Sequence, residues 1–414
     1  ESMTDEVSEL VLRNNVGQSL AVSLDELRSK EALDDFAALV AALERDRRLD
    51  RAAEGIPDPD AMRERAGQRT GLTRPTLAVL LSHAKLYAKG ALLESALPDD
   101  PATGPYLVGY FPAPAVEAAG PERLRAHQLR REIVTTELVN DLVNLMGSSF
   151  LHRMARDTGR SLPEAVRAWL VASRIAGGPE IRADLGELEA RYTADRVYRW
   201  LLGLGRVLEA TTQWLLANVP ADGDTDALIG DARGGLASLR GSFARFVAGE
   251  DRKLFFDRLG ELQDAGVDRT LAERLITLRF LPQLLEIVHV ARAAGSDDVR
   301  TAKVYYAVSE RFATASLREH LREGRHDPWE RRYAQTLAGD VARAQRALVA
   351  SVLARAAGNG EDVGHALKAL EKDRARQVQG YRELLQEVRS ESAPLAAFAL
   401  AVRALEGVAG GDGA

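Results

Sequence analysis

The chain has 414 residues and no cysteine; 46% of its residues are hydrophobic, 28% are charged, and its formal net charge is -6 at pH 7. The missing cysteines exclude disulfides and thiolate-based zinc or iron–sulfur sites, and the acidic balance argues against nucleic acid as a partner. No apolar run of membrane-spanning length occurs and the polar start is unlike a signal peptide, so we expect no membrane contact and a cytoplasmic location.

The first predicted elements are helices. Ser23-Leu-Asp-Glu26 has the spacing of a capping box and predicts a helix start. The stretch Gly71–Lys85 predicts a second helix, because Thr73 is a good N-cap residue and Pro75 is tolerated in a first turn. His83 and Lys85 lie two residues apart and point to different sides of that helix. We therefore interpret the stretch as a structural helix and not as a catalytic pair.

A proline-rich segment follows. Residues 97–121 contain six prolines, which marks a joint between two helical subdomains. The apolar run Tyr106–Phe111 predicts that this segment packs against the protein and is not a free linker.

The segment Leu129–Leu145 reads as a central helix. At 100° per residue Leu138 lies on one apolar stripe, while Leu129 belongs to a second apolar group that covers much of the remaining surface. The same wheel turns Arg131 and Glu132 inward, where each needs a partner.

The second half of the chain contains further N-cap patterns that predict helix starts. Stretches between them predict interruptions of the helices. Ser161–Glu164 and Asp327–Glu330 resemble capping boxes, and Asp268 precedes another amphipathic run. Breaks are expected at Gly177–Gly186 and Gly249–Arg252, among other places. Strand-like alternation is missing, so the class is all-α: a multi-helix array or bundle, with two helical subdomains possible.

The predicted organisation has four parts. A helical subdomain covers residues 1–97, a packed proline-rich connector covers 98–122, a main helical domain covers 123–406, and a disordered tail covers 407–414.

One spacing raises the question of a metal site. Glu286-Ile-Val-His289 has the Glu-x-x-His spacing that di-iron helical bundles use on two helices. No good second motif accompanies it, since Asp362-x-x-His365 and His320-x-x-Glu323 are imperfect substitutes. The favoured interpretation is a partly buried histidine near a helix end, and a metal site remains the alternative.

The remaining motifs carry little chemistry. Gly358–Gly364 has a glycine spacing seen in dinucleotide loops, but helical sequence precedes it where a strand would be required. The pair Asp34-Asp35 falls within a helix and the pair Asp297-Asp298 reads as a cap. We therefore assign no catalytic, cofactor-binding or metal-binding residue.

Several longer phrases resemble the C-terminal region of the large bacterial NAD-dependent glutamate dehydrogenases. The phrases are MTDEVSELVLRN at Met3–Asn14, GLTRPTLAVLL at Gly71–Leu81, ALPDD at Ala96–Asp100, HQLRREIV at His127–Val134, VNDLVN at Val139–Asn144 and KVYYAVSERF at Lys303–Phe312. Their order and spacing match from about residue 3 to about residue 350.

The resemblance implies a fragment of a longer chain, in which a regulatory half and a dehydrogenase domain precede a helical C-terminal domain. It implies NAD and the oxidative deamination of L-glutamate to 2-oxoglutarate and ammonia for the parent enzyme, and no cofactor in this segment. The implied role here is non-catalytic, in structure, assembly or regulation. The implied partners are the catalytic domain of the same polypeptide and further copies in a homo-oligomer. The alternative is a stand-alone helical metal- or ligand-binding enzyme using Glu286 and His289.

Overall fold

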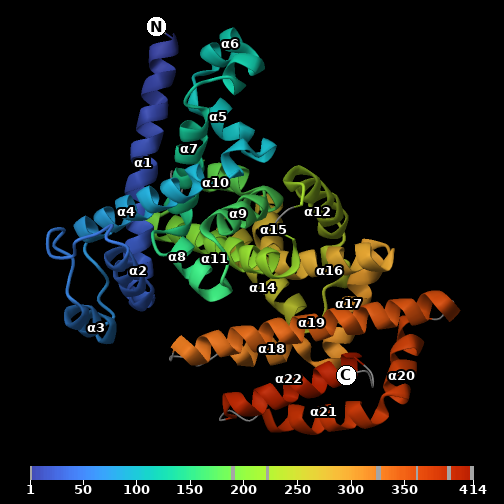
Figure 1. Cartoon of the computed structure of the whole chain (residues 1–414). Coiled ribbons are helices and arrows are strands. Elements are labelled where there is room, and N and C mark those ends of the chain that lie inside the picture. Colours follow the sequence, from blue (N-terminus) through green and yellow to red (C-terminus); the bar gives the residue numbers. More distant parts are fainter. Residues whose placement is uncertain are drawn as a thin grey trace. The chain divides into compact units, whose positions relative to one another are not determined.

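The computed structural model describes residues 2–187, 192–220, 223–322, 328–359, 362–388 and 393–410 (Figure 1). These residues form α-helices and two short 3-10 helices, and they contain no strand, which confirms the all-α class. The chain divides into two compact units, residues 1–230 and 231–414. The subdomain boundaries expected near residues 97 and 122 stay a prediction.

Unit 1 contains α1 Ser2–Glu31, α2 Leu33–Arg45, α3 Pro59–Gly67, α4 Arg74–Leu93, η1 Leu97–Asp99, η2 Pro101–Thr103, α5 Gly104–Tyr110, α6 Ala113–Arg125, α7 Arg130–Met146, α8 Phe150–Thr158, α9 Leu162–Ala176, α10 Gly178–Glu187 and α11 Ala194–Asn218. Helix α12, Thr225–Arg240, crosses the division between the units.

Unit 2 contains α13 Phe243–Phe246, α14 Gly249–Asp264, α15 Arg269–Leu278, α16 Leu281–Ala294, α17 Asp298–Phe312, α18 Thr314–Arg322, α19 Pro328–Asn359, α20 Val363–Asp373, α21 Ala375–Val388 and α22 Leu395–Gly410. The 32-residue α19 contacts α16, α17, α18, α20 and α22, so it is the central helix of this unit. Helices α21 and α22 lie side by side (Figure 1).

Helix α7 is central in unit 1, as predicted, with contacts to α1, α4, α5 and α11. Leu138 is fully buried in it. Arg131 is paired, because it forms a salt bridge with Asp99 and donates to the carbonyl of Ser95. The inward placement of Glu132 is wrong: it lies exposed in the first turn, where an acidic residue suits the helix dipole. Leu129 precedes the helix and is 56% exposed, so it does not extend the buried surface.

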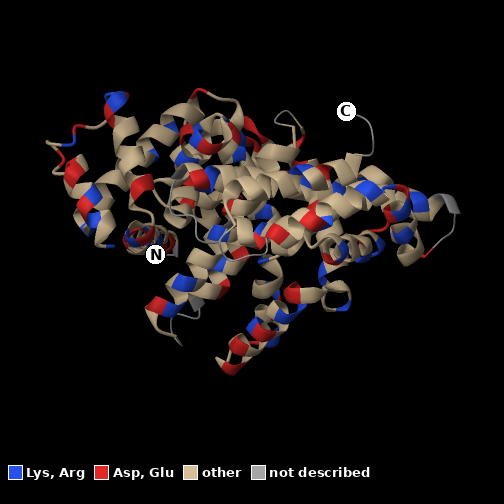
Figure 2. Ribbon diagram, turned by 90° about the horizontal axis from the view of Figure 1, so that it is seen from below, with Lys and Arg blue, Asp and Glu red and all other residues tan. Residues whose placement is uncertain are grey.

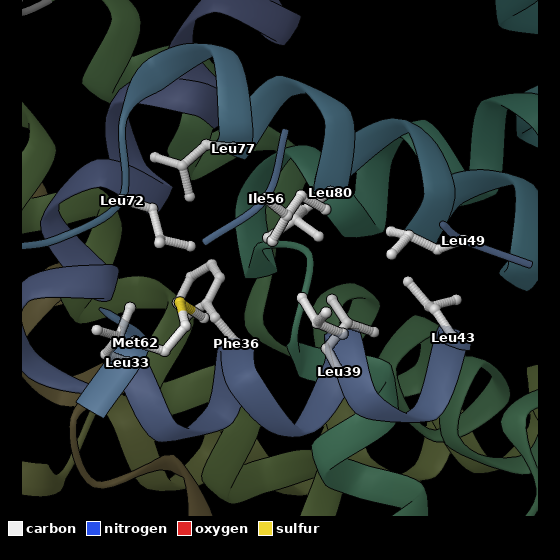
Figure 3. Close-up of a cluster of buried hydrophobic side chains, with 11 residues drawn as sticks. Leu33, Phe36, Leu39, Leu43, Leu49, Ile56, Met62, Leu72, Leu77 and Leu80 are labelled. Carbon is white, nitrogen blue, oxygen red and sulfur yellow. The ribbon is translucent and has the colours of Figure 1, made fainter. Parts of the chain in front are cut away.

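Apolar side chains of α2 and α4 form a compact core that includes Leu49 and Ile56 from the loop joining α2 to α3. Figure 3 shows the side chains of α2 pointing toward Leu72, Leu77 and Leu80. The helical spacing of Leu77 and Leu80 predicted this buried stripe, and both are fully buried. The stretch Gly71–Lys85 therefore packs as a structural helix through the face that carries Leu77 and Leu80.

The start of α4 differs from its prediction in one detail. Thr73 is the N-cap residue, but its side chain makes no capping hydrogen bond. Its hydroxyl oxygen lies 2.9 Å from that of Thr76 instead. Just before it, Gly71 lies against α1, where a Cβ atom would come 2.4 Å from Ser29 Oγ, while Leu72 N donates to that same oxygen at 3.0 Å. Only glycine fits this close approach.

The second half of α1 is clamped to the corner between α7 and α8. The buried carboxylate of Asp25 accepts from Ser148 N at 3.0 Å and Ser148 Oγ at 2.9 Å. It also accepts from Arg28 at 3.0 Å, and Arg28 donates to the carbonyl of Leu145. Gly147, with φ of 86°, leaves room for the clamp, since a Cβ there would come 2.3 Å from Asp25 Oδ1. This half of α1 is therefore fixed in unit 1.

Several predicted helix boundaries need correction. Ser23 does not start a helix, because α1 continues through it and its hydroxyl donates to the carbonyl of Ser19. The break at Gly177–Gly186 is confined to Gly177, the left-handed C-cap residue of α9, and α10 begins at once. The break at Gly249–Arg252 lies inside the first turn of α14.

The chain end is helical further than expected. Residues 407–410 belong to α22, where Val408 is buried and Arg374 donates to the carbonyl of Ala409 at 3.0 Å. A cation that bonds the last carbonyls stabilises a helix end. Residues 411–414 lie outside the described residues.

Other capping predictions are confirmed. Ser161 and Glu164 form a complete capping box, and the side chains of Asp268 and Asp297 accept hydrogen bonds at the starts of α15 and α17. Asp327 of the remaining box lies outside the described residues. Basic and acidic residues are distributed over many helices (Figure 2), and no helix in the described ranges combines the length and hydropathy needed to span a bilayer.

Candidate functional site

The Glu-x-x-His motif leads to a buried cluster of charged and polar side chains in unit 2. Glu286 on α16 is only 3% exposed. Its Oε2 accepts from the hydroxyl of Tyr305 on α17 at 2.6 Å, and its Oε1 accepts from Arg346 on α19 at 3.1 Å. Arg318 on α18 lies 3.7 Å from the same carboxylate. We call these four residues the Glu286 cluster.

Two members of the Glu286 cluster, Tyr305 and Arg318, have shifted pKa values. Burial raises the pKa of Tyr305 well above its usual value, although Arg318 opposes this. Burial alone would lower the pKa of Arg318, but Tyr305 and Glu286 outweigh it and raise that pKa. At neutral pH the tyrosine therefore remains a hydrogen-bond donor and the arginine a cation. The cluster is electrostatically satisfied from within the chain.

Further polar residues lie next to Tyr305 and Arg318 of the cluster. Gln345 accepts from the hydroxyl of Thr314 at 2.7 Å and donates to the carbonyl of Tyr305 at 3.3 Å. On another side Asp251 accepts from Gln283 at 3.2 Å, and burial raises the pKa of Asp251 despite the nearby Arg318. Gln345 thus ties the backbone of Tyr305 to α18, and Asp251 lies near enough to Arg318 to feel its charge.

This arrangement holds helices together and leaves Glu286 little capacity for a metal ion. Both carboxylate oxygens are already hydrogen-bonded, and two guanidinium groups lie beside them. His289 lies exposed on α16, so the predicted partial burial of this histidine is wrong, and desolvation by neighbouring atoms, followed by the charge of Arg346, lowers its pKa. Among the described residues no group of three or more histidine, aspartate or glutamate side chains could hold a metal ion. The cluster joins α16, α17, α18 and α19.

The substitute metal motifs are used locally. Asp362 accepts from Gly364 N at 3.1 Å and caps α20, the helix that carries His365. The Nδ1 atom of His320 lies 2.7 Å from the carbonyl oxygen of Ser316 on the same helix. Glu323 lies outside the described residues. These side chains serve helix ends and turns.

The glycine pattern at 358–364 joins two helices. Helix α19 ends at Asn359 and α20 begins at Val363, while residues 360 and 361 lie outside the described residues. A dinucleotide loop joins a strand to a helix, whereas this glycine pattern lies between the helices α19 and α20. The pairs Asp34-Asp35 and Asp297-Asp298 lie in the first turn of α2 and at the start of α17, as predicted.

Lys85, from the motif at the start of α4, has an unusual environment. It is half-buried beside Glu137 of α7, and burial lowers its pKa to about 8, with Glu137 opposing this and Lys89 adding to it. Burial raises the pKa of Glu137, which Arg13 opposes. Burial dominates both shifts, so the two groups share a poorly solvated site.

His83 lies on an open groove of unit 1 of about 840 Å³. Its Nε2 is 3.4 Å from Glu54. The groove is lined by acidic and basic side chains in similar number, which are Glu44, Arg47, Arg48, Asp50, Arg51, Glu54 and Asp58. The bidentate pair of Arg51 with Glu44 already neutralises part of the groove. Its chemistry therefore selects neither an anion nor a cation.

Sequence reasoning missed most of the Glu286 cluster. Tyr305 lies within the phrase Lys303–Phe312, which pointed to the family and not to a site. Arg318 and Arg346 had no distinguishing signal, because they are two of many arginines and reach Glu286 only through tertiary packing. By contrast, two other phrases are joined directly: Asp99 of Ala96–Asp100 pairs with Arg130 and Arg131.

Comparison with known proteins shows that this chain is similar to glutamate dehydrogenases. The family model described as "Glutamate dehydrogenase, C-terminal" matches residues 69–407. NAD-specific glutamate dehydrogenases of Halomonas elongata, Pseudomonas aeruginosa and Mycobacterium tuberculosis are 33%, 31% and 30% identical over 412, 405 and 410 residues. Each match covers 97% of this chain and 25% of the relative, so the chain spans a quarter of the length of these proteins.

Proposed function

Since the chain belongs to the glutamate dehydrogenase C-terminal family, we propose that it is the non-catalytic, all-helical C-terminal domain of an NAD-dependent glutamate dehydrogenase. The parent enzyme oxidises L-glutamate to 2-oxoglutarate and ammonia with NAD in the cytoplasm. In this proposal the segment braces the catalytic domain of the same polypeptide and contributes to assembly of a homo-oligomer.

The proposal rests on how much of this chain aligns with its relatives and on how much longer those relatives are. The chain aligns over nearly its whole length with enzymes four times as long, and the family model it fits is named for their C-terminal part. Oxidising glutamate with NAD needs a strand, a glycine loop and a helix to hold the pyrophosphate. The described residues form helices only, so they do not build that unit.

The buried charges support a bracing role. Glu286 is held by two arginines and a tyrosine, and Asp25 is held by Arg28 and Ser148. Such networks fix helices at defined positions. Helices held in a fixed arrangement by such networks suit a domain that braces a neighbouring one.

Two assays test the proposal. The isolated chain is incubated with glutamate and NAD, and we expect no NADH. The parent enzyme is then shortened by this segment, and its kinetics and light scattering are compared with those of the whole enzyme. We expect a lower rate or a changed subunit number, with the preference for NAD over NADP unchanged because the dinucleotide site lies elsewhere in the parent.

Either of two results would contradict the proposal. One is measurable turnover by the isolated chain. The other is a shortened parent that equals the whole enzyme in rate and in subunit number. The parent enzyme carrying Glu261→Lys is the control, because this substitution reverses the charge of one exposed residue of α14 and leaves the chain at full length. This variant should retain activity.

A further inference from the structure

Arg240, the last residue of α12, lacks a counter-ion in the described part of the chain. The residue is half-buried, and its Nη2 atom is buried without a hydrogen-bond partner among the described residues. Burying a charged group without a partner is unfavourable, and buried polar atoms of native proteins are nearly always hydrogen-bonded. This guanidinium therefore marks a place for a group that accepts its hydrogen bonds.

Helix α12 directs Arg240 and Arg233 to the same side. Seven residues separate them, which at 100° per residue is about 20° short of two full turns, and their Cα atoms are about 10 Å apart along the axis. The buried stripe with Leu236 lies to one side of this row. Gly235 fixes the packing of that stripe on α16, because a Cβ atom there would come 2.7 Å from Val288 Cγ2. The rotation of α12 that places both arginines is thus set by close packing.

A third arginine approaches from α15, which lies near α12 (Figure 1). Burial lowers the pKa of Arg240, and the positive charges of Arg274 and Arg233 lower it further. Arg233 and Arg274 have interactions of their own, yet no described acid near Arg240 opposes the effect of the two cations on it. All three residues belong to unit 2. We call them the Arg240 cluster.

Other arginines of the described chain have acids beside them. Arg153 and Arg182 also have a buried nitrogen without a partner, but they form salt bridges with Glu209 and Asp141. Eight described arginines have a shifted pKa, and for all but Arg240 an acidic side chain is among the causes. The chain thus compensates its buried arginines as a rule, and Arg240 departs from that rule.

The chemistry of the cluster selects an oxyanion. A guanidinium offers parallel N–H groups that match two oxygens of a phosphate or a carboxylate. Three neighbouring cations favour a ligand with two negative charges over one with a single charge, because each cation adds to the attraction. A bound oxyanion would also accept the hydrogen bond that Arg240 Nη2 does not make within the described chain.

We propose that the Arg240 cluster binds a small oxyanion with at least two negative charges, either a phosphate group or a dicarboxylate. The ligand is held between the end of α12 and α15, and Arg240 is the residue that contacts it from the buried side. This site goes beyond the proposed function and does not depend on it.

Calorimetric titration and thermal unfolding of the 414-residue chain test the site. The probes are sodium phosphate, sodium pyrophosphate and sodium succinate, each compared with sodium chloride at the same ionic strength. Arg240→Met keeps an unbranched apolar side chain and removes the guanidinium. Arg300→Met makes the same change at an exposed arginine of α17 and is the matched control.

We expect at least one of the three probes to bind the natural chain and the Arg300→Met chain with similar affinity and to raise their unfolding temperatures above the chloride value. Arg240→Met should bind that probe at least about tenfold more weakly, a loss typical of removing a charge-assisted hydrogen bond. In chloride alone, Arg240→Met should unfold at a higher temperature than the natural chain, because it no longer buries an unpaired charge. This second measurement also shows whether the variant is folded.

The choice of probe identifies the source of the charge. Binding of phosphate or pyrophosphate without succinate assigns a phosphate group, and the reverse assigns a dicarboxylate. No binding of any probe beyond the chloride control would overturn the proposal. Equal binding by Arg240→Met and the natural chain would also overturn it, since the anion would then lie elsewhere. The truncation assays on the parent enzyme are unaffected by either result.

Discussion

At the scale of single residues, Glu286 shows how one buried carboxylate can organise four helices. Its charge compensates Arg318 and Arg346, and its oxygens accept hydrogen bonds from Tyr305 and Arg346. Removing one partner of such a cluster destabilises the fold more than replacing the whole cluster with apolar residues would, because the remaining charges stay buried without a partner. The cluster therefore acts mainly on specificity of packing.

Glu286→Gln should lower the free energy of unfolding by about 3–5 kcal/mol, because Arg318 would remain buried without its carboxylate. Glu261→Gln is the control: its pair with Arg258 is about half exposed, and exposed pairs contribute at most about 1 kcal/mol. Urea unfolding of both variants measures the difference. Equal, small losses would show that solvent reaches the cluster.

Lys85 gives the stability a dependence on pH. Its pKa is about 8 in the folded chain and 10.5 ordinarily. Between these values the unfolded chain binds more protons, so the free energy of unfolding rises with pH through this window. Below about pH 8 both states are protonated and the cost of burying the charge is fully present.

Lys85→Met should therefore be more stable than the natural chain at pH 7, with the advantage shrinking as pH rises toward 10. Lys85→Arg keeps its charge across the window, so the natural chain should gain stability relative to it as pH rises. Thermal unfolding of the three proteins at pH 7, 8, 9 and 10 checks both trends. A difference that stays constant with pH would show that Lys85 is well solvated.

At the scale of elements, α7 is the helix around which unit 1 is packed. Its apolar residues meet α1, α4, α5 and α11. Its start is tied to η1, where Asp99 pairs with Arg130 and Arg131. The helix is thus held by burial along its length and by charge at its first turn.

Leu138→Ala should lower the free energy of unfolding by about 2–5 kcal/mol, because the site is fully buried and a cavity would remain. Leu129→Ala makes the same chemical change just before the helix, where the side chain is 56% exposed, and should cost less than about 0.5 kcal/mol. Chemical unfolding compares the two. Similar values would mean that α7 is peripheral.

Helix α1 illustrates what local signals leave out. Ser23-Leu-Asp-Glu26 has the residues of a capping box, yet the helix runs through it because the preceding residues are helical as well. Ser161-Leu-Pro-Glu164 has the same spacing and does start a helix, since Pro163 follows in the first turn and Gly159 ends the helix before it. A capping-box sequence therefore starts a helix only where the preceding residues are not themselves part of that helix.

At the scale of the whole molecule, the chain comprises two compact units with separate buried networks. Unit 1 has the clamp at Asp25, and unit 2 has the Glu286 cluster. Each unit is stabilised by its own apolar core. This organisation suits a domain whose proposed task is to hold another part of a long polypeptide in place.

The sequence by itself determined the all-α class, several helix starts, the buried stripe of α4 and the family. These depend on capping residues and on the spacing of apolar residues, which are local properties. Only the tertiary structure decided which charges are buried together, as with Glu286 and Arg346, and which apolar residues remain uncovered, as with Val7 and Val11. Periodicity states that a helix face is apolar, but the partner of that face comes from segments distant in the chain, and no local pattern encodes their meeting.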